Sequence, residues 1–179
     1  MVSNVLIQDF VNTLHKDPVG DEEDLSSPAA LASWLAANGL ASPKVRTTAA
    51  ELRQAKELRE ALRVLLLAHN EVEVDEASAE AVLDRVARKA RVELRFEGDG
   101  PELVPVAAGV AGALGRIVAA VHGAVADGSW QRLKACRASD CEWAFIDNAK
   151  NQSRAWCSMR SCGNREKARA FRRRHAHTS

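Results

Sequence analysis

The stretch CSMRSCGNREKARAFRRR, residues 157–174, places two cysteines directly before an arginine-rich segment, with four residues between the cysteines. A second pair with the same spacing lies upstream, and fifteen residues separate the two pairs. This arrangement is typical of four thiolates that converge on one tetrahedral Zn²⁺ ion. The sequence therefore predicts a single zinc ion bound by Cys136, Cys141, Cys157 and Cys162.

The other common uses of cysteine fit this pattern less well. The N-terminus lacks the charged and apolar regions of an export signal, so we expect a cytoplasmic protein, and disulfides rarely persist in that compartment. A Cys-x-x-Cys redox pair is absent. Four cysteine ligands leave no open position for water or substrate, which predicts a structural metal. Apolar runs such as 64–68 are short of the ~20 residues that cross a bilayer, so no membrane partner is expected.

The segment between the two pairs predicts a small hairpin. In EWAFIDNAKNQSRAW, residues 142–156, Trp143 and Phe145 alternate before a polar turn, and Trp156 follows on the return. We expect this aromatic face to pack under the metal, with base stacking as the alternative use. Gly163 is expected to complete the second metal knuckle, and Asn164 is expected to cap a helix that begins at Arg165.

This last helix has two predicted sides. Arginines recur at positions 165, 169, 172 and 173 on one side, while Ala168 and Phe171 lie on the other and are expected to pack. Knuckle, hairpin, knuckle and helix together suggest a treble-clef-like finger over residues 131–179. The candidate nucleic-acid contacts are Lys150, Arg154, Arg165, Lys167, Arg169, Arg172, Arg173 and Arg174. The alternative interpretation of the charge run is a solvated helix end.

The charge distribution separates the finger from the rest of the chain. Residues 1–130 hold 13 Lys and Arg against 20 Asp and Glu, a net charge of −7, whereas residues 131–179 hold 12 against 4, a net charge of +8. A polyanion would be repelled by the first part and attracted by the second. Any nucleic-acid partner is therefore expected at the C-terminal part.

Residues 1–130 are predicted to form a mainly helical domain. Apolar residues recur near the helical period over residues 4–15, 48–69, 77–90 and 109–126, and a further helix is expected between Ser27 and Asn38. Alternation over residues 91–106, with a turn at 98–100, predicts a β-hairpin. The fold class is therefore mainly α with a small β-hairpin, followed by the four-cysteine finger.

This helical domain carries little recognisable chemistry. Asp9, Asn12 and His15 are spaced three apart, so one helix face could present Asp9 and Asn12 to a ligand pocket. The alternative is a solvated or hydrogen-bonded face. No glycine-rich phosphate loop, serine-nucleophile elbow or His-Glu-x-x-His pair is present.

Several motifs resemble a known pair of families. The finger resembles the CGNR zinc fingers through CGNR at residues 162–165, CxWxFxD at 141–147, SRxWCSM at 153–159 and NREKAR at 164–169. Where that family often has DxS after the phenylalanine strand, this chain has Asp147, Asn148 and Ala149. Residues 4–130 more loosely resemble the helical ABATE domain that precedes this finger in bacterial stress-response transcription regulators, chiefly through DFVNTL at 9–14 and LASWLAANGL at 31–40.

Three functions are compatible with these features. The first is a DNA-binding transcription regulator that sets the arginine-rich helix on a duplex. The second is a zinc-stabilised adaptor that binds an acidic protein surface or RNA through the same helix. The third is an enzyme with a pocket in the helical domain. That domain could sense a small-molecule effector, form a homo-oligomer or hold the basic tail, and the sequence does not choose among these roles.

Overall fold

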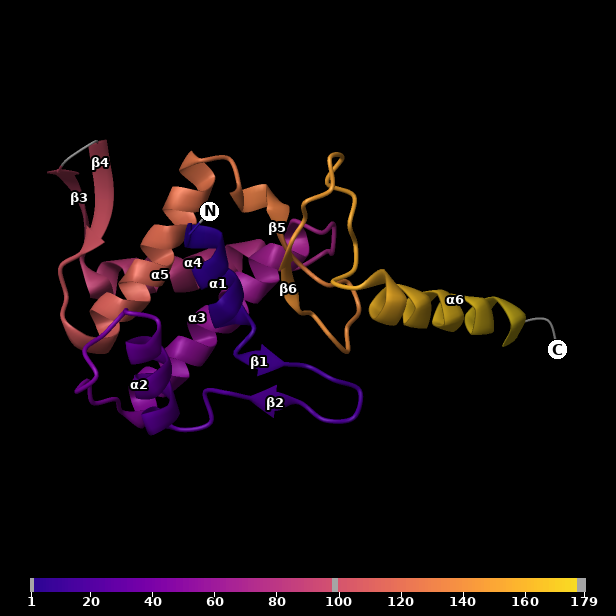
Figure 1. Cartoon of the computed structure of the whole chain (residues 1–179), viewed down its shortest axis with the longest axis horizontal. Coiled ribbons are helices and arrows are strands. Elements are labelled where there is room, and N and C mark those ends of the chain that lie inside the picture. Colours follow the sequence, from indigo (N-terminus) through magenta and orange to yellow (C-terminus); the bar gives the residue numbers. More distant parts are fainter. Residues whose placement is uncertain (1, 98–99, 177–179) are drawn as a thin grey trace.

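Five helices form the body of the molecule, and each begins where the sequence offers a capping side chain or an apolar stripe. In this computed structural model, which describes residues 2–97 and 100–176, they are α1 (Val2–Val11), α2 (Pro28–Ala37), α3 (Ala49–Ala68), α4 (Glu76–Ala90) and α5 (Gly109–Ala126) (Figure 1). Ser27, Thr48 and Asp75 cap α2, α3 and α4 by accepting hydrogen bonds from backbone N–H groups three residues ahead. The predicted helical body is confirmed.

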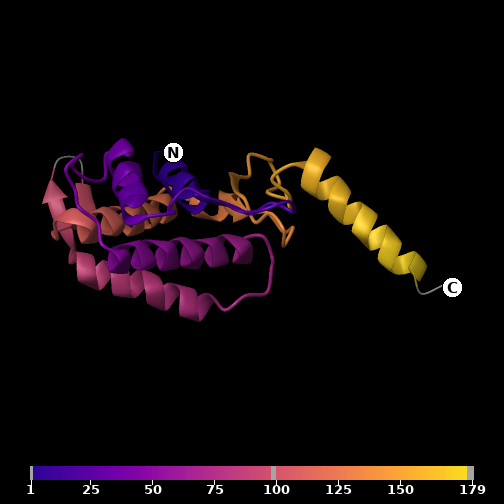
Figure 2. The same ribbon diagram turned by 90° about the horizontal axis from the view of Figure 1, so that it is seen from below.

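The core lies where α1, α3, α4 and α5 pack against one another (Figure 2). Ile7 and Phe10 of α1 and Leu114 and Ile117 of α5 are fully buried there. By length and composition α5 could also cross a membrane. In this fold the buried residues of α5 pack in the core, whereas much of its C-terminal half is partly or fully exposed.

The first helix ends earlier than the sequence predicts. It stops at Val11, and Leu14 lies instead in β1 (Leu14–His15), which pairs antiparallel with β2 (Glu22–Glu23). The reason is a set of competing hydrogen bonds, because the Thr13 hydroxyl donates to the Phe10 carbonyl and the Thr13 carbonyl accepts from Asp24 N. The loop between these two short strands, residues 16–21, lies next to the finger, where Lys16 pairs with Glu142.

A second hairpin projects from the far end of the body. Strand β3 (Val92–Glu97) pairs antiparallel with β4 (Gly100–Pro105), as the alternating sequence predicts. Residues 98–99 of the predicted turn lie outside the described residues. Figure 1 shows this hairpin at the end of the molecule opposite the C-terminal helix.

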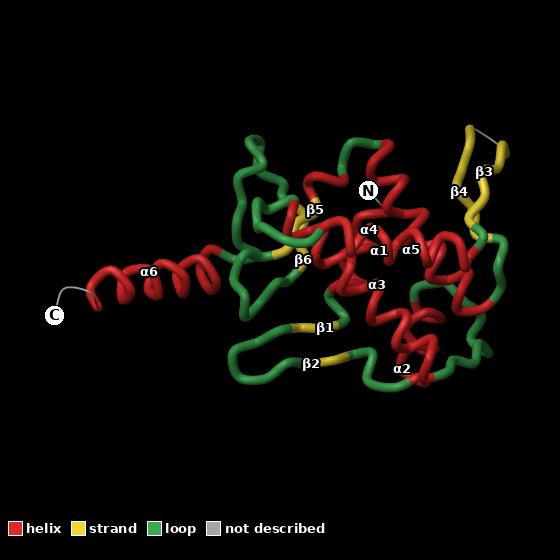
Figure 3. Tube along the Cα trace, turned by 180° about the vertical axis from the view of Figure 1, so that it is seen from behind, coloured by secondary structure: helices red, strands yellow, loops and turns green. Residues whose placement is uncertain are grey.

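The finger contains a hairpin, but its strands differ from those predicted. Strand β5 (Leu133–Ala135) pairs with β6 (Ala144–Ile146), and the first cysteine pair lies in the connection between them. Within the described residues no strand follows β6, so Trp156 lies in a loop rather than on a returning strand (Figure 3). The 3₁₀ turn η1 (Trp130–Arg132) leads into β5, and a π-helical turn, η2 (Met159–Gly163), leads into α6 (Asn164–Ala176), which projects away from the body.

The core does not stop at the predicted boundary between the two parts. Leu133, Ala135 and Ala144 of the finger hairpin are completely buried within the same apolar cluster as the helices of the body. Strand β5 packs on α3 and β6 packs on α1. The division of the chain at residue 130 stays a prediction, but the hairpin of the finger is part of the main core.

Candidate metal centre and basic helix

The four cysteines converge as their spacing predicts. Their Sγ atoms all lie within 4.8 Å of one another, and all but the half-buried Cys157 are buried. Cys157 Sγ is 3.6 Å from Cys141 Sγ and 3.7 Å from Cys162 Sγ. Four sulfurs at ~2.3 Å from a tetrahedral Zn²⁺ are about 3.8 Å apart, so the donor set fits this ion.

The electrostatics of the cluster are also compatible with a bound cation. The Cys141 and Cys157 thiols donate to Cys136 Sγ and lower the pKa of Cys136 to about 2. The same contact raises the pKa of Cys141 to about 12, and the neighbouring sulfurs raise the pKa of Cys157 as well. Cys136 is therefore the thiol that ionises first, and its negative charge opposes the ionisation of Cys141 and Cys157. A divalent ion removes this conflict and allows all four thiols to ionise.

Aromatic side chains pack around the sulfurs, as the sequence predicts. Phe145 is buried against the cysteines, and the half-buried Trp143 and Trp156 lie beside it. A Cβ atom on Gly163 would lie 2.3 Å from Met159 Sδ and 3.0 Å from Trp156 Cδ1. A larger residue at this position would have to displace the Met159 side chain, so the glycine is favoured by packing and not by its backbone conformation.

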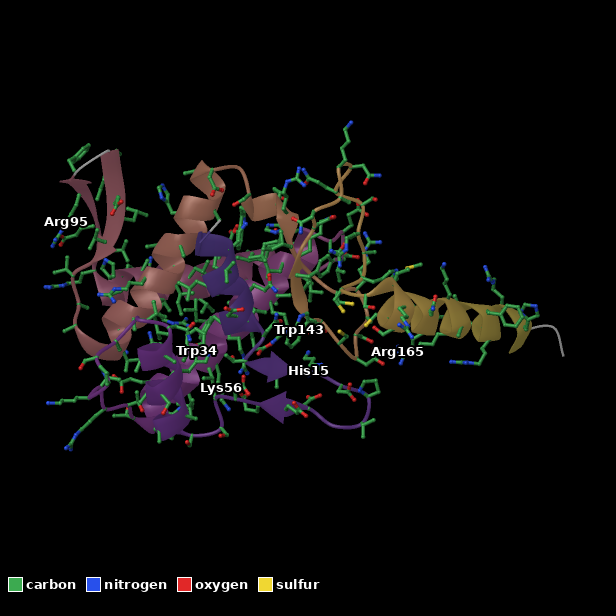
Figure 4. All side chains as sticks on the ribbon, in the orientation of Figure 1. His15, Trp34, Lys56, Arg95, Trp143 and Arg165 are labelled. Atoms are coloured by element: carbon green, nitrogen blue, oxygen red, sulfur yellow. The ribbon has the colours of Figure 1, made fainter. Side chains whose placement is uncertain are left out.

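Ion pairs join the first knuckle to the start of α6. Arg165 Nη2 is 2.9 Å from an Asp140 carboxylate oxygen, and Arg169 donates to the other oxygen of Asp140 and to Glu166. Arg165 Nη2 also lies 3.5 Å from Cys162 Sγ, beside the sulfur cluster in Figure 4. Arg165 is therefore directed toward the metal centre. Its positive charge faces a zinc ligand and braces the helix.

The helix begins differently from the prediction. Asn164 has helical backbone angles and its side chain donates to the Arg160 carbonyl, so it is the first residue of α6 and not a cap. Ser158 performs the capping role one turn earlier by accepting a hydrogen bond from Ser161 N. The π-helical turn between them carries Cys162 into the cluster.

The predicted nucleic-acid residues fall into two groups. Arg154, Arg165 and Arg169 are used within the finger, since Arg154 lies 4.7 Å above the Phe145 ring and donates to the Cys157 carbonyl. The second group is exposed. It consists of Lys150, Lys167, Arg172, Arg173 and Arg174.

The predicted packing side of α6 is wrong. Phe171 is 56% exposed and stacks on His175 of the same helix, with ring centroids 4.0 Å apart. The physical reason is that α6 leaves the body at the metal centre, so its outer turns have no apolar surface to cover (Figures 1 and 2).

The body holds the finger through polar side chains. Asn12 of the predicted pocket accepts from Ala144 N at 2.8 Å and donates to Ala144 O at 3.0 Å, which binds β6 as a neighbouring strand would. Asn70 donates to the carbonyls of Ala135 and Ala155. Asp9 is exposed on α1. The structure thus gives Asn12 a partner in the finger instead of pairing it with Asp9.

Two arginines of α3 are buried, and the sequence alone did not identify them; Arg63 contacts the finger, whereas Arg59 contacts β2. Arg63 is 1% exposed and donates to the carbonyls of Val11, Leu14 and Glu142. Arg59 binds both carboxylate oxygens of Glu23, at 2.7 and 3.0 Å. Their signal in the sequence is their position, because both lie on the apolar side of α3.

Asp147 organises the loop after β6. It is completely buried, and its carboxylate accepts from Lys134 Nζ and from the backbone N–H groups of Ala149 and Arg154. These hydrogen bonds hold its pKa below the ordinary value despite the opposing effect of burial. At Ala149, where the related fingers often have serine, the backbone N–H supplies this contact.

Comparison with known proteins agrees with this geometry. Residues 4–132 match the ABATE family, described as "Putative stress-induced transcription regulator", and residues 132–175 match the CGNR zinc finger. No curated protein sequence matches the chain. The four-cysteine cluster lies within the CGNR match, so its metal is one structural zinc ion. Because the first match spans most of the chain, the protein belongs to the ABATE family and carries a C-terminal CGNR zinc finger.

Proposed function

We propose that this protein is a DNA-binding transcription regulator of the cytoplasm, in which the zinc finger holds α6 in position on a duplex. The observation that carries the proposal is the form of α6. It projects from the body, is anchored at one end by the metal centre, and exposes basic side chains along its outer turns. An isolated helix of this length is only marginally stable in water, so a polyanion that neutralises its charges would also stabilise it.

The ion pairs separate the basic residues that fix the position of α6 from those that are left to contact DNA. Arg165 and Arg169 are committed to Asp140, so they set the direction in which α6 leaves the finger. Lys167, Arg172 and Arg173 are exposed and form no ion pair within residues 2–97 and 100–176. We assign phosphate contacts to these three residues and to the exposed Lys150 and Arg174.

Lys167, Arg172 and Arg173 lie on α6, which projects away from the body (Figure 1). Arginine can bind guanine or phosphate through two parallel hydrogen bonds, whereas lysine acts as a point charge. The acidic body, with its net charge of −7, would be repelled by the duplex and would keep the contact restricted to the finger. The two family descriptions name a regulator and a zinc finger, which supports this function over an enzymatic one.

The test is duplex binding as a function of salt, measured by fluorescence anisotropy with a labelled random-sequence duplex and the zinc-loaded full chain. The variant Lys167→Ala/Arg172→Ala/Arg173→Ala should retain its zinc. Its plot of log affinity against log salt should be flatter by about 2.7, since each lost phosphate contact contributes about 0.9 to the slope.

A matched variant controls for net charge alone. Lys44→Ala/Arg46→Ala/Arg53→Ala removes the same charge from the body, at exposed residues that form no ion pair in the described ranges, and it should bind like the parent protein. The proposal fails if the parent shows no salt-dependent affinity for a duplex, or if both triple variants weaken binding equally. Preference for a single-stranded RNA or an acidic peptide over the duplex would favour the adaptor function instead.

A further inference from the structure

The β3–β4 hairpin exposes an apolar face that the body covers only near its base. Pro105 packs close to α5, because a Cβ atom on Gly115 would lie 2.9 Å from Pro105 Cβ. Beyond the helix, Leu94 is 52% exposed and Phe96 is 79% exposed, on the same side of the strand as the half-buried Val92. Large apolar side chains this exposed on a projecting element are typical of an interaction surface.

The two edges of this hairpin are protected to different degrees. Val106 N donates to Arg91 O, and the direction of the backbone N–H and C=O groups alternates along an antiparallel strand. The backbone groups of residues 93 and 95 therefore point toward β4. Those of residues 92, 94 and 96 point away from β4, to the open edge of the hairpin. On β4 the outward positions opposite Phe96 and Val92 are prolines, which have no N–H group to offer. The β4 edge is thus blocked to a further strand, whereas β3 presents outward N–H and C=O groups without proline.

The charges on β3 are arranged for pairing with an identical strand. In an antiparallel pair of two β3 strands centred on Leu94, Glu93 of one copy lies opposite Arg95 of the other, and the reverse pair forms by symmetry. Residues 92, 94 and 96 then form the hydrogen-bonded pairs, and residues 93 and 95 form the closer pairs between them. Both charged side chains are exposed and form no ion pair within the described residues, and Arg95 points away from the helices in Figure 4.

We propose that the β3 edge binds a second copy of this chain, forming a two-fold symmetric dimer with a continuous four-stranded sheet. The same register joins the apolar faces, with Leu94 beside the partner subunit's Leu94 and Val92 beside the partner subunit's Phe96. A single strand edge is a small interface, so the dimer should be reversible, with a dissociation constant on the order of micromolar. The hairpin lies at the end of the molecule opposite α6, so this association leaves both basic helices accessible (Figure 1).

Charge exchange on β3 tests both the partner and the register. Sedimentation velocity of the zinc-loaded full chain over a wide concentration range should show a monomer–dimer equilibrium. Glu93→Arg and Arg95→Glu each place like charges opposite one another, and each should raise the dissociation constant roughly tenfold or more. The double variant restores opposite charges and should dimerise like the parent. An equal mixture of the two single variants should also dimerise, because their charges are complementary.

A backbone variant tests the strand edge itself. Leu94→Pro removes an outward N–H group that the hairpin does not use, so it should abolish dimerisation while circular dichroism and zinc content stay unchanged. A parent protein that is monomeric at every concentration would overturn the proposal. So would a dimer that neither single charge variant weakens. Neither result depends on DNA binding, so the dimer and the proposed function can fail independently.

Discussion

Replacing Arg63 by methionine should destabilise the whole protein, because this one side chain binds three backbone carbonyls from two segments far apart in the sequence. Its guanidinium donates to Val11 O at 2.8 Å, Glu142 O at 2.9 Å and Leu14 O at 3.2 Å, and its Nε is 3.0 Å from a Glu60 carboxylate oxygen. Methionine has a similar length and favours helices, so α3 should persist. The three carbonyls would lose a charged donor.

The size of the effect follows from these contacts. A hydrogen bond to a charged group contributes about 1.5–3 kcal/mol, and a buried carbonyl without a partner costs about 1–3 kcal/mol. Part of this loss is offset, because burying the apolar methionine side chain avoids the free-energy cost of removing a charged guanidinium from water. Three lost hydrogen bonds of this kind, less the recovered desolvation, lead us to expect a net loss of about 3–5 kcal/mol. For a chain of this size the melting temperature would fall by roughly 6–20 °C.

Urea unfolding of the zinc-loaded protein, followed by circular dichroism and tryptophan fluorescence, measures this change. Arg53→Met on the exposed side of α3 is the control and should alter stability by less than about 0.5 kcal/mol. Because Glu142 follows a zinc ligand, zinc should also pass to a chromogenic chelator faster in the Arg63 variant. A stability loss below about 1 kcal/mol, with unchanged zinc release, would refute the role assigned to Arg63.

Three further predictions concern the metal, the packing and the pH dependence. The parent should carry one zinc per chain by metal analysis, and Cys157→Ser/Cys162→Ser should not retain it, while most helical signal persists. Gly112→Ala would place a Cβ atom 2.0 Å from the Ala107 carbonyl oxygen and should cost roughly 1–3 kcal/mol in thermal unfolding, whereas Gly20→Ala meets no atom and should be neutral. Burial lowers the pKa of His69 below 6.5, so unfolding takes up a proton and stability falls as pH drops below 6.5; His69→Gln should lose this part of the pH dependence in urea titrations.

The helices and the metal site could be predicted because their signals are local or repeated. Apolar periodicity predicted the body helices, and the expected helix between Ser27 and Asn38 matches α2, whereas the cap Asp75 was not predicted. The cysteine spacing identified the zinc ligands, since few other arrangements bring four thiols together.

The contacts between the two parts could not be predicted, because they join residues far apart in the chain. Strand β5 has only three residues, and a lysine, the buried Lys134, stands at its centre. The sequence therefore shows no alternating apolar pattern that would predict its pairing with β6. Buried arginine is rare, which concealed Arg63. Phe171 was predicted to be buried and is exposed. An amphipathic pattern indicates a packing side only if the fold provides an apolar surface for it.

The hydrogen bonds from Asn12 and Asn70 to the finger affect the order in which the two parts fold during synthesis. Chains fold from the N-terminus as they leave the ribosome. Both asparagines and the helices that precede them, α1 and α3, are synthesised before the last cysteine, Cys162, has been translated. The finger hairpin therefore emerges onto a surface that already offers hydrogen-bond partners for its strands. Zinc capture becomes the final step, and the body acts as an internal template for it.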